Sequence, residues 1–86
     1  MGKFEKLISK ILSGASDKNI TFQELLTSLK KFGFEERTKG SHHIFYRKDI
    51  EEIINIQADK NGNAKPYQVK QIREIILKYR LMIKNK

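Results

Sequence analysis

Apolar residues near the start of the chain recur every three or four positions, which is the spacing of one face of an α-helix. The first such stretch, residues 3–12, predicts a short amphipathic helix that ends at Gly14 before a polar connector. The second follows Thr21 and Glu24, whose three-residue separation predicts a capping box that satisfies two unpaired backbone N–H groups. Gly33 suits the left-handed end of this second helix. Its apolar face comprises Phe22, Leu25, Leu26, Leu29 and Phe32.

Beyond the second helix, the pattern changes to short β-rich runs separated by turn residues. These runs predict three strands, over 34–38, 41–47 and 53–58. The first turn is expected at Lys39-Gly40, and the polar run 48–52 is expected to connect the second strand to the third.

The last part of the chain predicts a loop over 59–63 and then one more helix. Pro66 fits the first turn of this helix, where its missing N–H costs no hydrogen bond, and the helix is expected to run to about Met82. Leu77 and Leu81 fall on its outer side among cations, as ordinary surface leucines or as a docking spot for an acidic protein partner. Its buried stripe should comprise Val69, Ile72, Ile75, Ile76, Tyr79 and Ile83.

The order helix, helix, three antiparallel strands, helix predicts an α+β domain with its helices packed on one face of the sheet. A chain of 86 residues has room for one such domain, over 1–86. We expect residues 1–19 to form an extra N-terminal helix with its connector, and residues 20–83 to form the core of the domain.

Composition narrows the class of protein. The chain has no cysteine, which removes disulfides, thiolate metal sites and a cysteine nucleophile, and suits a reducing cytosol. No apolar run approaches the ~18 residues that a membrane span needs, and the N-terminus lacks the apolar stretch of a signal peptide. We therefore expect a soluble cytoplasmic protein with no membrane partner.

The net charge of +8 is concentrated near the C-terminus, where residues 65–86 hold 7 basic and 1 acidic side chains. A basic helix on a small protein indicates a polyanion partner, usually a nucleic acid, bound through its phosphates. The alternative is a lysine-rich surface that only contacts solvent.

Few arrangements for catalysis are present. The sequence lacks the phosphate-loop, dinucleotide, zinc-peptidase and hydrolase-elbow motifs, so no cofactor or small-molecule partner is expected. The acidic pairs Glu35-Glu36 and Glu51-Glu52 are poorly placed to share a proton or a metal, since neighbouring strand residues point to opposite faces. The only histidines are His42 and His43, and no third ligand for a metal is indicated.

The setting of the two histidines indicates a chemistry. They follow Gly40, which lets a ligand approach the backbone closely, and Ser41, which offers a hydroxyl and an amide. Histidine suits proton transfer near neutrality, and RNA carries its own nucleophile in the 2′-hydroxyl. A histidine among cations can therefore cleave RNA without a metal, although such a pair is more often an ordinary surface or half-buried feature. The expected phosphate contacts are Arg37, Lys39, Arg47, Lys65 and Arg73.

Two motifs, together with a final helix rich in Ile and Leu, resemble the HicA family of small toxins. They are Leu25-Leu26-x-x-Leu29-x-x-Phe32-Gly33-Phe34 and Arg37-x-Lys39-Gly40-Ser41-His42-His43-Ile44-Phe45. The resemblance covers roughly Thr21 to Leu81. It implies a double-stranded-RNA-binding-domain-like fold and a ribosome-independent mRNA interferase whose catalytic histidine lies in the Gly-Ser-His motif. It also implies a HicB-type antitoxin that covers the active site.

Motif matching favours His42 as the catalytic histidine, but strand alternation alone does not decide between it and His43. If Ile44 and Tyr46 face the helices, His42 goes inward with them; if Phe45 faces the helices, the assignment reverses. The sequence departs from the family pattern in two places. The helix over 3–12 precedes the usual start of such toxins, and 59–67 differs from the usual proline- and histidine-containing segment.

Two functions remain after this comparison. The first is a metal-independent endoribonuclease toxin with histidine as general acid and base, and the second is a non-catalytic RNA-binding module of the same fold. Both predict RNA binding that weakens steeply with salt, so cleavage must separate them.

Overall fold

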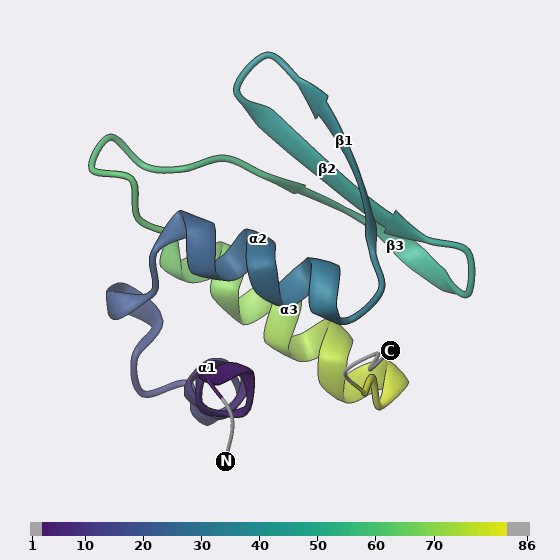
Figure 1. Ribbon diagram of the computed structural model, residues 1–86, viewed down its shortest axis with the longest axis horizontal. Helices are drawn as coiled ribbons and strands as arrows, with labels where there is room; N and C mark the ends of the chain where they lie inside the picture. Colours follow the sequence, from purple (N-terminus) through teal and green to yellow (C-terminus); the bar gives the residue numbers. More distant parts are fainter. Residues whose placement is uncertain (1–2, 83–86) are drawn as a thin grey trace.

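The computed structural model describes residues 3–82 as one small α+β domain (Figure 1). Its three α-helices are joined to a three-stranded antiparallel sheet in the strand order β1-β2-β3. The predicted fold class is thus confirmed, and the arrangement is compatible with a double-stranded-RNA-binding-domain-like fold. In chain order the elements are α1 (Lys3–Ser13), the 3-10 helix η1 (Asp17–Asn19), α2 (Phe22–Lys31), β1 (Glu35–Lys39), β2 (His42–Arg47), β3 (Ile50–Ile56) and α3 (Pro66–Tyr79).

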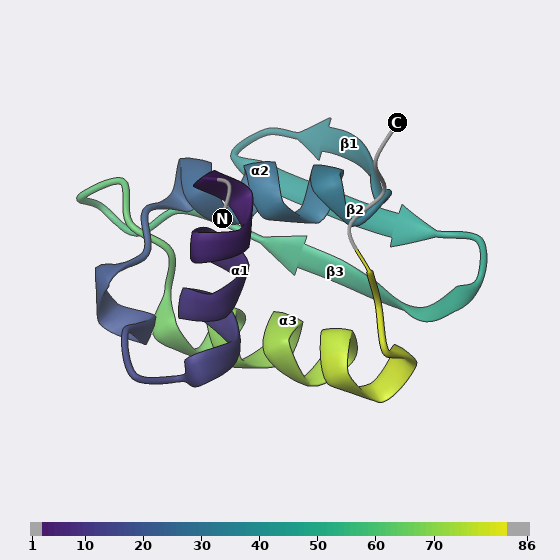
Figure 2. The ribbon, with the colours of Figure 1, turned by 60° about the horizontal axis from the view of Figure 1, so that its bottom comes forward.

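Helices α2 and α3 lie side by side beneath one face of the sheet, while α1 runs across their other side (Figures 1 and 2). Strand alternation produces this layering, because Phe45, Ile54 and Ile56 all point to the helices and are fully buried. The opposite face of the sheet, which we call the open face, has none of the described helices over it. Helix α1 belongs to the same core, since Ile8 and Ile11 are buried in it.

Local signals position α2 as predicted. The Thr21 side chain accepts a hydrogen bond from the Glu24 amide at 3.0 Å, and the Glu24 carboxylate accepts one from the Thr21 amide at 2.9 Å. Gly33 has φ +90°, the left-handed conformation that glycine adopts without the steric cost a side chain brings. The amphipathic pattern, the cap and the terminating glycine all agree, so the structure confirms this helix.

The predicted connection over 48–52 is wrong, because β3 begins at Ile50 and leaves only two residues between β2 and β3. Ile50 is buried, and Glu52 points toward α3 rather than into solvent. The Glu52 carboxylate accepts hydrogen bonds from the Tyr79 hydroxyl at 2.6 Å and from Lys78 Nζ at 2.7 Å. Glu51 and Glu52, a charged pair that is typical of a turn, therefore lie in β3. The Glu52 side chain has its partners on α3.

The prediction that the last helix extends to about Met82 is also wrong. Helix α3 ends at Tyr79, and Arg80 takes the left-handed conformation with φ +52°. The amide of Leu81 then donates to the carbonyl of Ile76 at 3.0 Å, which turns the chain back onto the domain. The sequence holds no glycine at this position to mark the helix end, and the predicted burial of Ile83 lies outside the described residues.

No helix within residues 3–82 is long and apolar enough to cross a membrane.

Acid should weaken the attachment of β3 to α3. Hydrogen bonds from Lys78 and Tyr79 lower the pKa of Glu52 from 4.5 to about 2, so folding stabilises the ionised form. This contribution is fully present above about pH 4.5 and is lost as the pH falls toward 2. We expect Glu52→Gln to flatten this part of the curve of unfolding free energy against pH, measured by urea denaturation. Parallel curves for the variant and the wild-type chain would contradict this role of Glu52.

Candidate functional site

The β1–β2 hairpin carries the Gly-Ser-His-His motif. Strand β1 ends at Lys39, which pairs with His42, so Gly40 and Ser41 form the tip of the hairpin. Gly40 has φ +61°, and no atom lies within 4 Å of the place where a Cβ would be. The turn therefore requires glycine for its backbone conformation, while the space beside the tip is open.

The register of the sheet decides which way each histidine points. Phe45 is fully buried beneath the helices and pairs with Glu36 on β1 and Ile54 on β3. Because strand residues alternate, His43 faces the helices with Phe45, and His42 lies on the open face. Of the two alternatives that the sequence allowed, the structure has the one in which Phe45 turns inward.

His43 is held by a carboxylate and an aromatic ring. Its Nδ1 lies 2.5 Å from Oε2 of Glu36, and its ring meets that of Phe22 edge-on, with centroids 5.1 Å apart. Hydrogen bonding to His43, followed by hydrogen bonding to Lys30, lowers the pKa of Glu36, so Glu36 is a carboxylate at neutral pH. A carboxylate only accepts hydrogen bonds, so the proton of a neutral His43 ring lies on Nδ1, and Nε2 has the lone pair.

Three neighbours of His43 were not among the predicted site residues: Glu36, Phe22 and Lys30. Lys30 Nζ lies 3.0 Å from the second carboxylate oxygen of Glu36, which completes a row from α2 through β1 to β2. Strand alternation could have found Glu36, since it shares the inward face with Phe45 once the hairpin register is known. The side chain of His43 remains 25% exposed, so it is only partly covered by these neighbours.

The loop before α3 lies beside the segment that contacts His43. The Phe22 amide donates to the Gly62 carbonyl at 3.1 Å, and the Ala64 amide donates to the Ile20 carbonyl at 2.9 Å. These bonds fix the loop alongside the first turn of α2, whose Phe22 contacts His43. Lys65, a predicted phosphate contact, follows directly and is half-buried just before α3.

His42 has a different environment on the open face. It is exposed, and its Nδ1 lies 3.0 Å from the side-chain oxygen of Asn55, a neutral group. Two predicted cations, Arg37 and Lys39, share this face and are exposed. Ser41 at the hairpin tip accepts a hydrogen bond from the Gln57 side chain at 3.0 Å. The two histidines therefore define two separate surfaces of one hairpin.

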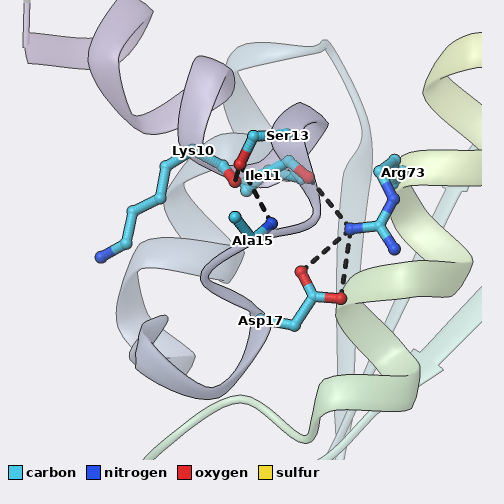
Figure 3. A network of polar contacts seen from close by, with 6 residues as sticks. All are labelled: Lys10, Ile11, Ser13, Ala15, Asp17 and Arg73. Carbon is cyan, nitrogen blue, oxygen red and sulfur yellow. Dashed lines mark hydrogen bonds and ion pairs between the residues drawn. The ribbon is translucent and has the colours of Figure 1, made fainter.

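Two of the predicted phosphate contacts, Arg47 and Arg73, make internal contacts within the fold. Arg47 donates to the Phe32 carbonyl at 2.6 Å and to both oxygens of Asp49, and it is 15% exposed. Arg73 Nη1 donates to the Ile11 carbonyl at 3.1 Å and to Asp17 at 2.9 Å (Figure 3). These guanidinium groups join elements of the fold, because both bind carbonyls distant in sequence.

The predicted pair of outer leucines is only half correct. Leu77 is 60% exposed, as expected. Leu81 is partly buried against the core, because the left-handed turn at Arg80 moves it off the outer face of α3. Of the two predicted contacts for a partner protein, Leu77 therefore lies exposed on α3 and Leu81 does not.

The described part of the chain holds no group of three or more His, Cys, Asp or Glu that could bind a metal ion.

Fold and site together define a small α+β domain with a histidine–carboxylate pair beside a glycine turn. The sequence profile described as "HicA toxin of bacterial toxin-antitoxin" matches residues 22–79. The chain therefore belongs to the HicA family, a toxin of a toxin–antitoxin system with an antitoxin as its partner. Comparisons with curated proteins and with solved structures found no match.

Proposed function

We propose that this chain is a metal-independent endoribonuclease that cleaves mRNA in the cytoplasm, with His43 as its general acid and base. The observation that carries the proposal is the hydrogen bond between His43 and the Glu36 carboxylate. A base oriented by a third group is the arrangement that activates hydroxyl nucleophiles in many enzymes. His42 remains the alternative, with Asn55 as its partner on the open face.

The reaction uses the lone pair on Nε2 of His43. This nitrogen accepts the proton of a ribose 2′-hydroxyl, and the 2′-oxygen attacks the adjacent phosphorus. The bond from phosphorus to the 5′-oxygen breaks, and the leaving oxygen takes up a proton, which the imidazolium can return. The products carry a 2′,3′-cyclic phosphate and a 5′-hydroxyl, so DNA is not a substrate. The negative charge of Glu36 stabilises the imidazolium that forms during the reaction.

The proposed contacts to the RNA backbone lie around the hairpin tip. Gly40 and Ser41 offer backbone amides, and Arg37, Lys39 and Lys65 offer positive charge. Lys65 follows the loop that is hydrogen-bonded to the start of α2, whereas Arg37 and Lys39 flank the tip from the open face. Arg47 and Arg73 are left out of this set because their guanidinium groups are bound internally.

We propose a HicB-type antitoxin as the neutralising partner, with Leu77 as one of its contacts. The exposed leucine lies on α3, within the segment 65–86 that holds 7 basic and 1 acidic side chains. An apolar side chain among cations suits an acidic protein surface.

Expression in bacteria tests the function. We expect the wild-type chain to arrest growth, and the double variant His42→Ala/His43→Ala to permit it at equal protein levels. Co-expression of the antitoxin should restore growth with the wild-type chain. Equal arrest by the double variant would contradict histidine catalysis, and RNA binding without cleavage by the wild-type chain would favour the RNA-binding module.

A further inference from the structure

Helix α1 lies outside the residues matched to the HicA family, yet it is packed against the core and hydrogen-bonded to α3. Arg73 of α3 binds the Ile11 carbonyl at the end of α1 and Asp17 of the following 3-10 helix (Figure 3). Gly14 fits against this arginine so closely that a Cβ would lie 3.3 Å from it, and φ +74° also requires glycine there. The position of α1 relative to α2 and α3 is therefore fixed.

The fixed helix leaves an open groove between itself and the first half of α2, with a volume of about 740 Å³. We call it the α1–α2 groove. Phe4 and Leu7 of α1 line it as half-buried apolar side chains, with Gln23 and Thr27 on the α2 side. Its size falls within the range that holds ligands or a partner's side chains.

Positive charge surrounds this apolar lining. Lys6 and Lys10 line the groove, and Lys31 Nζ lies 4.4 Å from the centre of the Phe4 ring. The carboxylate in the lining, Glu24, already accepts the hydrogen bond from the Thr21 amide that caps α2. An occupant therefore meets apolar side chains and a net positive edge.

We propose that the α1–α2 groove docks an acidic amphipathic helix of a protein partner. Apolar residues on one face of such a helix would contact Phe4 and Leu7, and its carboxylates would meet Lys6, since Lys10 Nζ already donates to the Asn19 carbonyl at 2.8 Å. RNA fits less well, because Lys31 covers the Phe4 ring on which a base would stack, and Leu7 is aliphatic. The proposal rests on the toxin–antitoxin function, since the antitoxin is the partner that supplies the helix.

The test uses the full chain and, as the probe, a purified HicB-type antitoxin, with binding measured by calorimetry. Lys6→Glu reverses an exposed charge and should weaken binding by about tenfold. Thr27→Trp fills the groove and should weaken binding by about tenfold or more. Lys48→Glu, the same charge change at the β2–β3 turn, should bind as the wild-type chain does. Unfolding temperatures would verify that each variant is folded.

Unchanged binding of both groove variants would overturn the proposal. The proposal would also be overturned if Leu77→Asp were the only variant to lose binding, or if Lys48→Glu lost as much binding as the two groove variants. Absence of any binding by the wild-type chain would overturn it as well, together with the proposed partner. RNA cleavage distinguishes this inference from the proposed reaction, because Lys6→Glu and Thr27→Trp should cleave RNA normally while His43→Ala should still bind the antitoxin.

Discussion

Replacement of His43 by alanine should slow RNA cleavage by about 100- to 10,000-fold, which is the usual contribution of a general acid or base. His42→Ala should slow RNA cleavage by less than about tenfold, because His42 faces the open side of the sheet and has a neutral partner, Asn55. Both effects follow from the inward position of Phe45, which places His43 beside Glu36.

Single-turnover rates on a short labelled RNA would measure both losses. His43 also packs against Phe22, so His43→Gln provides a second variant that keeps a polar side chain without the ability to shuttle a proton. Unfolding temperature and RNA affinity should stay near wild-type values in this variant. A larger loss for His42→Ala than for His43→Ala would move the reaction to the open face, with Arg37 and Lys39 as its neighbours.

The second large effect is expected at Glu36. Glu36→Gln keeps a side chain of similar size but removes the charge that accepts the His43 hydrogen bond. A hydrogen bond to a charged group contributes about 1.5–3 kcal/mol, so we expect kcat to fall about 10- to 100-fold with KM nearly unchanged. Glu36→Asp, which retains the carboxylate, should recover part of the rate.

Glu35→Gln is the matched control for this experiment. Glu35 is the preceding residue of β1 and is exposed, so the same chemical change occurs on the opposite face of the strand. If Glu36→Gln and Glu35→Gln had the same small effect on kcat, Glu36 would have no role in orienting His43. A purely structural role would instead lower the unfolding temperature of Glu36→Gln and leave kcat of the folded enzyme intact.

The parts of the fold that were predictable from sequence are those fixed by neighbouring residues. The cap of α2 depends on Thr21 and Glu24, three positions apart, and both of its hydrogen bonds are present. The start of β3 was missed because Glu52 finds its partners, Lys78 and Tyr79, on a helix far along the chain. The end of α3 was missed because a left-handed arginine, rather than a glycine, terminates it.

The same distinction applies to the site. The two histidines and the glycine turn are adjacent in sequence, so a local pattern was enough to single them out. Glu36 contacts His43 only through the register of the hairpin, which no local pattern specifies. Arg47 and Arg73 were expected to bind phosphate because their charge is visible in sequence, whereas their internal acceptors, at Phe32 and Ile11, depend on the folded chain.

Analysis of the ends of cleaved RNA, produced by the purified chain in EDTA, tests the central claim most directly. We predict fragments with a 2′,3′-cyclic phosphate and a 5′-hydroxyl, and we predict that a 2′-deoxy substitution at the cleaved nucleotide blocks the reaction. Both results follow from attack by the 2′-oxygen after a histidine removes its proton. Cleavage that requires added Mg²⁺, or that proceeds at the 2′-deoxy nucleotide, would contradict the account.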